Sequence, residues 1–376
     1  MFDKNRFFVD EDVRKAETLP PEAYSSKEFL ELELKTIFKN SWICVPALSG
    51  SEIEKKGARM PFEFLGKPLF LERDSKEELR VFSNVCTHKW HILVLKPEIN
   101  AHTTCPYHGR IYVNGKFVSQ AGAKAAENFP RECDNLLEFK TAKWWKLFFV
   151  SLGSPEADLD ETLKALKGSL AKLPLEKAKR KAHKEDFRPL PGNFLQHADN
   201  YLDYFHTLFI HAKKGGLADK VDFDSYKKGV EFYPYSCLQW CYAKNPKHGF
   251  DPSLLPERFG DPKGEKRVYA LWWFLPPNLT INVWPWGISV NVYEPSLENT
   301  LETKFWWQHY VWDEKKYKLR NKIWLNDEVD AEDIKAVEAV KRGIESGFAP
   351  RGKFMPGYEN VSHWFHRWIY KNMFEK

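Results

Sequence analysis

Hydrophobic positions recur with two different periods along the chain, and the change of period marks its parts. Apolar residues three and four positions apart, behind a proline-rich lead, predict a helix over residues 20–47. From residue 60 to 153 the pattern changes to short alternating runs broken by turn residues. These runs predict strands at 62–71, 79–85, 110–118 and 144–152. Asn114-Gly115 predicts a hairpin because both residues tolerate positive φ, so we expect a small antiparallel β domain here.

The second half of the chain mixes helix and strand patterns. Regularly spaced leucines predict an amphipathic helix between residues 154 and 190: Leu163, Leu166, Leu170 and Leu173. Three residues are expected to stop the chain after it: Pro189, Pro191 and Gly192. A second helix is predicted from Asn193 to about Leu208. Later patterns predict strands at 268–274, 279–283, 288–293 and 303–312 and helices at 331–346 and 360–373, and the mixture indicates an α+β fold.

Composition and charge exclude several classes of protein. The 57 basic residues are set against 52 acidic ones along the whole length, giving a net charge of +5 without the basic stripe of a nucleic-acid binder. No run of about 18 apolar residues occurs and the charged start does not fit a signal peptide, so we expect a cytoplasmic protein without a membrane span. Six cysteines are too few for a disulfide scaffold, and in a reducing compartment cysteine near histidine indicates metal instead.

Two short clamps in the predicted β domain each supply one thiolate and one imidazole. Cys86 and His88 form the first clamp, Cys105 and His108 form the second, and 16 residues separate them. A Rieske [2Fe–2S] centre needs two cysteines on one iron and two histidines on the other, so each loop would give one ligand of each kind. Structural zinc is the alternative, although mixed zinc sites more often pair Cys with Cys and His with His.

A second group of candidate ligands follows Gly192. Asp203 and His206 are three residues apart and are expected to share a helix face. His211 lies five residues beyond His206, about 140° round an ideal helix, so one metal takes both only if the helix ends or distorts between them. Two histidines and a carboxylate on one face are typical of non-heme iron that activates O₂, and core histidines are the alternative.

The two clamps resemble those of a known family. The pattern C-x-H, sixteen residues, C-x-x-H, with Cys-Pro-Tyr-His-Gly in the second loop, is similar to the Rieske domain of the ring-hydroxylating oxygenases, in particular of their α, or terminal oxygenase, subunit. Respiratory Rieske proteins carry an extra cysteine in each loop, where this chain has His91 and Tyr107. The family commonly has Arg-Gly and Trp where Lys89-Trp90 and Arg110 stand here. These departures concern the tuning and docking surface of the cluster, not its ligands.

The second group resembles the mononuclear iron motif of the same family, N-x-x-D-x-x-H-x-x-x-x-H, which begins here at Asn200. The resemblance implies His206 and His211 as iron ligands. It implies Asp203, together with Asn200, as catalytic, with Asp203 linking the iron to the Rieske centre. Such a carboxylate accepts an imidazole N–H from a cluster ligand and another from an iron ligand, which fixes their tautomers.

The resemblance also implies a third iron ligand far along the chain. Asp333 stands five residues before Glu338, as in the carboxylate segment of the family, and is the predicted ligand. Glu332 is the runner-up. An acidic helix face opposite Lys335 is the alternative interpretation of this segment taken alone.

The resemblance extends over nearly the whole chain and implies its organisation. Residues 1–40 would be the N-terminal helical part of a catalytic domain of the helix-grip (START/SRPBCC-like) class, 41–153 the inserted Rieske domain and 154–376 the rest of the catalytic domain. The assembly would be a homotrimer, with or without a small β subunit, in which the cluster of one subunit serves the iron of its neighbour.

The implied chemistry is oxygen activation. Electrons from a ferredoxin or flavin reductase would reach the [2Fe–2S] cluster and then Fe(II), and O₂ would hydroxylate or oxidatively demethylate a small organic substrate. Four tryptophans are candidates for either its pocket or the core: Trp272, Trp273, Trp284 and Trp286. The rival function is a helix-grip ligand-binding protein, or an electron carrier, with a structural metal.

Overall fold

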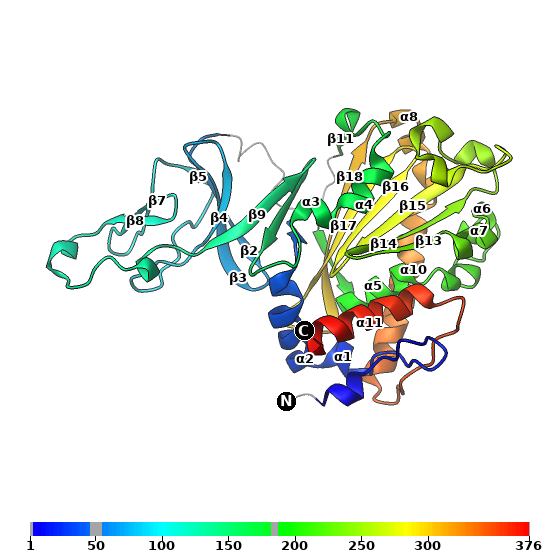
Figure 1. Cartoon of the computed structure of the whole chain (residues 1–376), viewed down its shortest axis with the longest axis horizontal. Helices are drawn as coiled ribbons and strands as arrows, with labels where there is room; N and C mark the ends of the chain where they lie inside the picture. The colour runs from blue at the N-terminus through cyan, green and yellow to red at the C-terminus, as the bar shows by residue number, and fades with distance from the viewer. Residues whose placement is uncertain (1–2, 46–54, 182–186, 376) are drawn as a thin grey trace. The chain divides into compact units, whose positions relative to one another are not determined.

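The computed structural model describes residues 3–45, 55–181 and 187–375, and it divides into two compact units (Figure 1). One unit is Phe38–Glu156, and the other combines Met1–Ile37 with Ala157–Lys376. The smaller unit is therefore an insertion near the start of the larger one. The described strands pair antiparallel in both units and the larger unit adds long helices, which confirms the predicted α+β class.

The smaller unit is built from short strands. Its described residues form a seven-stranded sheet in the order β1-β10-β9-β4-β3-β2-β5 and a three-stranded sheet β6-β7-β8. The bounds are β1 Ile43–Cys44, β2 Ala58–Phe64, β3 Lys67–Arg73, β4 Leu79–Ser83, β5 Glu98–Ile99, β6 Thr103–Thr104, β7 Ile111–Val113, β8 Lys116–Ser119, β9 Glu138–Trp144 and β10 Leu147–Ser151. One buried cluster joins the two sheets, with Cys86 and Cys105 among its members beside Phe82 and Tyr112.

Two hairpin turns test the strands predicted from the hydrophobic pattern, and only one of the two turns was predicted. Asn114 and Gly115 have φ of 48° and 73° and join β7 to β8, which confirms the predicted hairpin. The single strand predicted at 62–71 is wrong, because Leu65 and Gly66 adopt φ of 50° and 70° and turn the chain from β2 into β3. Leucine is an uncommon residue at positive φ, so the apolar run hid the turn.

The larger unit is a curved sheet with helices packed against it (Figure 1). In the described residues the strand order is β11-β18-β17-β16-β15-β14-β13, and β12 also pairs with β18. The bounds are β11 Lys179–Arg180, β12 Phe187–Pro191, β13 Val230–Tyr233, β14 Ser236–Tyr242, β15 Val268–Leu275, β16 Leu279–Trp284, β17 Gly287–Pro295 and β18 Glu302–Val311. The meander β15 to β18 confirms the four predicted strands, whereas the pattern missed β13 and β14.

Helices connect and cover this sheet. The bounds are α1 Glu22–Ser25, α2 Lys27–Thr36, α3 Leu159–Thr162, α4 Lys164–Leu170, α5 Phe194–Leu202, α6 Leu217–Lys220, α7 Phe223–Lys228, α8 Glu314–Lys318, α9 Arg320–Ile323, α10 Asn326–Glu345 and α11 Asn360–Phe374. Helix α5 contacts β17 and β18, and α10 contacts α5 and β12. The two predicted C-terminal helices are confirmed as α10 and α11. Among the described residues, no helix combines the length and apolar character needed to span a bilayer.

Three predicted helices are wrong in extent. The helix over 20–47 is split into α1 and α2 and is followed by β1, because the chain enters the smaller unit there. The helix over 154–190 is short as well: α3 and α4 bury the four leucines, and the chain then returns to the sheet as β11 and β12. The prolines expected to stop the chain, Pro189 and Pro191, lie within β12. The third case, after Asn193, shapes the metal site described next.

Candidate metal centres

The two clamps of the smaller unit are built alike. In the first loop the Cys86 N–H donates to the carbonyl of His91 (2.8 Å), and the Trp90 N–H donates to the carbonyl of Cys86 (3.0 Å). In the second loop the Cys105 N–H donates to the carbonyl of Arg110 (2.8 Å), and the Gly109 N–H donates to the carbonyl of Cys105 (3.0 Å). Trp90 and Gly109 occupy equivalent positions, with φ of 59° and 64°. Equivalent backbone hydrogen bonds therefore fold both loops and hold each Cys–His pair in the same way.

The four predicted cluster residues lie at two depths. Cys86 and Cys105 are 1% and 2% exposed, whereas His88 is half-buried and His108 is exposed. The two imidazole rings lie edge to face, with centroids 4.8 Å apart. Burial raises the pKa of Cys86, but hydrogen bonds from Tyr112 and from the backbone at His88 outweigh it and leave the pKa below its ordinary value. Two buried sulfurs beneath two outer imidazoles fit a [2Fe–2S] centre with cysteines on one iron and histidines on the other.

The second group lies where α5 ends. Asn193 caps this helix: its side chain accepts from the Leu195 N–H (2.8 Å), and its own N–H donates to Gln196 Oε1 (2.7 Å). The helix ends at Leu202, and Asp203 leaves helical geometry with ψ of 92°. Asp203 Oδ1 accepts from the Phe205 N–H (2.8 Å), a local bond that competes with the helix.

The predicted helix to Leu208 is therefore wrong, and so is the helix face expected to hold both Asp203 and His206. A 3₁₀ turn, η8 (Phe205–Leu208), follows instead. His206 Nδ1 still lies 3.6 Å from Asp203 Oδ2, although Asp203 lies outside this turn. The condition stated for the two histidines, that the helix ends before His211, is confirmed.

Three side chains converge on one point. His206 Nε2 and His211 Nε2 lie 3.4 Å and 3.2 Å from Asp333 Oδ1, and 3.3 Å from each other. Asp333 comes from α10, which packs against α5 although residues 203–325 separate the two helices along the chain. The fold itself therefore assembles the set. Asp333 Oδ1 is buried without a well-formed hydrogen bond. Two neutral nitrogens and a carboxylate oxygen meeting at one buried point fit a 2-His-1-carboxylate iron site.

In the metal-free protein, the pKa values of these side chains favour a protonated His206 beside an ionised Asp333. Burial opposes the charge on His206, but polar contacts with Asp203 and Asp333 and their negative charges outweigh it and raise the pKa of His206 to about 9. The pKa of Asp333 is lowered, since its polar contacts with both histidines and their positive charges overcome the effect of burial. A cation at this point is therefore electrostatically favoured.

Glu332, the runner-up ligand, points elsewhere. Its Oε2 lies 2.7 Å from His211 Nδ1, and its Oε1 lies 2.6 Å from Lys213 Nζ. Glu332 thus holds the far nitrogen of His211, so that Nε2 faces the convergence point. Sequence reasoning missed this supporting role and that of Lys213. Neighbouring helix positions point about 100° apart, which is the signal that separates Asp333 from Glu332.

A cavity of about 400 Å³ adjoins the three side chains. Asn200, Asp203, His206, His211 and Asp333 all line it. Several aromatic side chains form much of its wall: Tyr226, Trp272, Trp284, Tyr293, Phe305 and Trp307. Of the four tryptophans considered from the sequence, Trp272 and Trp284 line the cavity, while Trp273 and Trp286 are fully buried in the core.

Comparison with known protein families shows to which family the chain belongs. A model described as "Ring hydroxylating alpha subunit (catalytic domain)" matches residues 176–375, and a model described as "Rieske [2Fe-2S] domain" matches residues 41–130. The chain belongs to the ring-hydroxylating oxygenase α subunits. It is a Rieske non-heme iron oxygenase that uses a [2Fe–2S] cluster, a mononuclear iron and O₂ as co-substrate.

Relatives of this oxygenase are similar along most of its length. It is 26% identical over 369 residues to choline monooxygenase of Spinacia oleracea, covering 95% of this chain and 79% of that one. It is 26% identical to the carnitine monooxygenase oxygenase subunit of Escherichia coli (strain K12), covering 91% and 88%.

Solved structures show the same fold. A quaternary ammonium Rieske monooxygenase superposes with a TM-score of 0.74 at 22% identity, covering 96% of this chain and 97% of that one. Naphthalene 1,2-dioxygenase from Rhodococcus sp. superposes with a TM-score of 0.71 at 19% identity, covering 96% and 95%. The architecture is thus shared by oxygenases that act on unlike substrates.

Proposed function

We propose that this oxygenase is the terminal component of a multicomponent system that hydroxylates a small organic substrate with electrons from a ferredoxin or flavin reductase. The observation that carries the proposal is the convergence of His206, His211 and Asp333 on one point beside the cavity. In this proposal they hold the iron. The cluster is held by two residues of each clamp: Cys86, His88, Cys105 and His108.

Each group of residues has a distinct task. When bound, the two centres supply electrons one at a time and activate O₂. The aromatic wall excludes water and orients the substrate, and Glu332 fixes the tautomer of His211. The overall hydroxylation consumes one C–H bond, O₂, two electrons and two protons, and yields C–OH and water. The electrons come from the external reductase.

Asp203 is the proposed link between the centres. One of its oxygens faces His206 Nδ1, and its side chain is 24% exposed. A carboxylate in this position accepts the N–H of an iron ligand on one side and leaves the other side accessible to a histidine of the cluster. We include in the proposal a homotrimer in which that histidine belongs to a neighbouring copy.

The cavity favours a small quaternary ammonium substrate over an aromatic hydrocarbon. Faces of Tyr and Trp attract cations, and Tyr226, Trp272 and Trp284 lie together on the wall, with Tyr226 stacked on Trp272 at 5.0 Å. Asp330 adds a carboxyl group to the same cavity; burial raises its pKa to about 7, and a bound cation would favour its ionised form. The relatives named for choline and carnitine oxidation also favour this class. Arg188, which lies over Trp307 at 5.2 Å, offers a second charge to a substrate that carries a carboxylate.

Coupled oxygen consumption tests the proposal. Purified oxygenase is supplied with a ferredoxin–reductase pair, and choline, carnitine, glycine betaine and naphthalene are compared for O₂ uptake and hydroxylated product. We expect uptake with at least one quaternary amine and product in equal molar amount. Uptake with naphthalene alone would overturn the substrate class. Absence of iron at the His206 site in gently isolated protein would overturn the function.

A further inference from the structure

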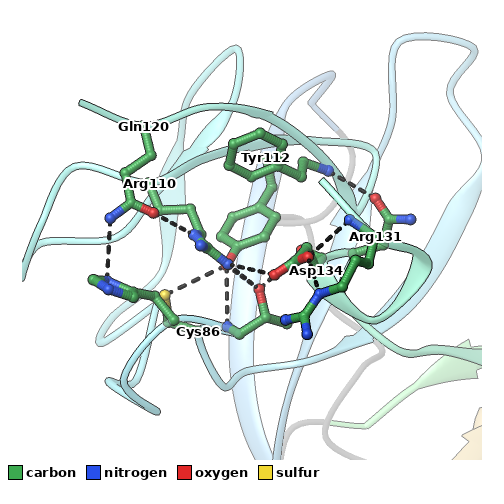
Figure 2. Close-up of polar contacts among 10 residues, drawn as sticks. Cys86, Arg110, Tyr112, Gln120, Arg131 and Asp134 are labelled. Atoms are coloured by element: carbon green, nitrogen blue, oxygen red, sulfur yellow. Dashed lines mark hydrogen bonds and ion pairs between the residues drawn. The ribbon is translucent and has the colours of Figure 1, made fainter. Parts of the chain in front are cut away.

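A buried arginine closes the second cluster loop, and Figure 2 shows its polar contacts. Arg110 follows Gly109 in the second loop and is only 4% exposed, although the charged end of an arginine is costly to bury. Its guanidinium lies 5.2 Å from the ring centroids of Phe117 and Phe129, which pack edge to face against each other. In related oxygenases a tryptophan commonly occupies this position, so the buried charge distinguishes this chain.

The charge of Arg110 is only partly compensated. Its Nη1 lies 3.3 Å from Asp134 Oδ1, a long contact. Asp134 is also bound by Arg131, whose Nε and backbone N–H donate to Oδ2 at 3.1 Å and 2.8 Å. Two arginines thus share one carboxylate, which leaves a net positive charge. Arg131 is 64% exposed and is screened by water, whereas Arg110 is not.

One arm of hydrogen bonds runs from Arg110 to a cluster histidine. The Arg110 Nε–H donates to Gln120 Oε1 at 2.6 Å. Because that oxygen is taken by the guanidinium, the amide must direct its nitrogen the other way. Gln120 Nε2 lies 3.2 Å from the ring of His88, at Nδ1. Arg110 therefore sets which end of Gln120 meets His88.

The other arm runs to a cluster cysteine. Arg110 Nη1 donates to Thr87 Oγ1 at 2.8 Å, and Thr87 Oγ1 donates its own proton to the carbonyl of Asp134 at 2.8 Å. The Thr87 backbone N–H donates to the Tyr112 hydroxyl oxygen at 3.1 Å, and this hydroxyl lies 3.4 Å from Cys86 Sγ. An ionised Cys86 accepts the hydroxyl proton. Arg110 thus holds Thr87, whose N–H places Tyr112 against the sulfur.

We propose that Arg110 is a positioning residue for the Rieske centre, which holds Gln120 and Tyr112 against two cluster ligands and stabilises the reduced cluster by its fixed charge. The inference rests on the proposed ligand set. Reduction adds one negative charge to the cluster, and a nearby buried cation lowers the energy of that state more than that of the oxidised one. Because Arg110 is buried, solvent screens this attraction less than it would at the surface.

Redox titration of the holoenzyme, followed by its paramagnetic signal, tests this inference. Arg110→Gln removes the charge, and Arg110→Lys keeps the charge but loses the two-armed fork. We expect Arg110→Gln to lower the equilibrium constant for reduction at least about tenfold, equivalent to 59 mV for one electron, and to shift the signal. Arg110→Lys should change the equilibrium constant less than about threefold and still shift the signal, because the arms are lost.

Arg131→Gln is the matched control, since Arg131 shares Asp134 but is exposed; it should change neither quantity by more than about a quarter of the Arg110→Gln effect. An Arg110→Gln protein that retains full iron and sulfide with an unchanged equilibrium constant and signal would overturn the inference. If Arg110→Gln does not assemble a cluster, Gln120→Leu and Arg110→Lys test the inference in its place. Unchanged paramagnetic signals in both variants would overturn the inference. The readout needs no turnover, so absence of a cluster in the unmodified protein would instead refute the ligand set.

Discussion

The two candidate metal sites of this oxygenase are made in opposite ways. The cluster residues, from Cys86 to His108, sit on two loops that repeat one hydrogen-bonding pattern within a single small unit. The iron residues come from the end of α5 and from α10, and Asp333 is far from His206 along the chain. The first site is therefore a local structure presented by a hairpin-rich domain. The second exists only once the large sheet and its helices have packed.

This difference predicts that each site can be lost alone. The largest expected effect follows His206→Ala, which removes one ligand from a site of three protein groups. We expect loss of the mononuclear iron and a fall in turnover of more than about a hundredfold. This exceeds the effect of losing a residue that only hydrogen-bonds to a metal ligand. Metal analysis should still find two irons and two sulfides per chain. His248→Ala, at a half-buried histidine outside the metal site in the same unit, is the control and should retain all iron.

The converse substitution is Cys86→Ser. A serine hydroxyl is a poor replacement for a thiolate ligand, so the cluster should fail to assemble while the iron site in the larger unit stays intact. Visible absorption reports the cluster, and iron content should fall by about two thirds, given two irons in the cluster and one outside it. His102→Ala, an exposed histidine of the same unit, should leave both unchanged. Loss of the single iron as well would contradict the independence of the sites.

A smaller effect is expected for Asp203→Asn. The substitution keeps the size of the side chain but removes the charge that faces His206, so both metals should remain and turnover should fall about 10–100-fold. Stopped-flow oxidation of the reduced cluster measures the slowed step. Asp199→Asn, one turn earlier on α5, is the control. Normal turnover in Asp203→Asn would show that the electron path lies elsewhere.

Iron removal should make only the larger unit sensitive to alkaline pH. The pKa of His206 rises to about 9 in the folded metal-free protein, so protonated His206 contributes stability that is fully present below about pH 6.5 and is lost as the pH rises through 9. The expected loss is on the order of 3 kcal/mol, from a shift of about 2.5 pKa units. Urea unfolding of iron-depleted protein at pH 6.5 and 9.5 measures it, and His206→Gln should reduce the dependence to the part that His211 contributes, because Asp333 and Glu332 raise the pKa of His211 as well.

The smallest effect compares the two cluster loops directly. Trp90 occupies the left-handed position that Gly109 occupies in the other loop, and it is 79% exposed. Trp90→Gly should stabilise the smaller unit by about 0.5–1 kcal/mol, because relief of strain exceeds the entropy lost by glycine. Gly109→Ala, which meets no neighbouring atom, should cost about as much. Thermal unfolding with the cluster intact measures both, and equal effects of one sign would show that the loops are not equivalent.

The sequence was most informative where chemistry and spacing coincide. Cys86, His88, Cys105 and His108 are close along the chain, so a motif and turn residues were sufficient to predict their grouping. The choice of Asp333 over Glu332 rested on resemblance alone, since only the packing of α10 determines which carboxylate faces inward. The end of α5 at Leu202 was missed because the bond from Asp203 to the Phe205 N–H is a local alternative that the apolar periodicity does not reveal.

Arg110 could not be interpreted from its position in the sequence. It was noted as a departure from the family pattern, but its partners Gln120 and Asp134 lie 10 and 24 residues away and meet it only in the folded loops. A buried charge depends on what surrounds it, and neighbouring residues along the chain do not specify that. The same limit applies to Lys213, whose contact with Glu332 spans two distant segments.

The prolines of β12 have a consequence for the molecule in solution. The Gly192 N–H donates to the carbonyl of Leu301, the residue before β18, and Pro191 pairs with Glu302 at the start of that strand. Pro189 and Pro191 have the opposite parity to Gly192, so an N–H group at either position would point away from β18. Proline has none to offer. A foreign strand approaching this border therefore finds no regular row of donors, which guards the long antiparallel sheet against self-association during synthesis and storage.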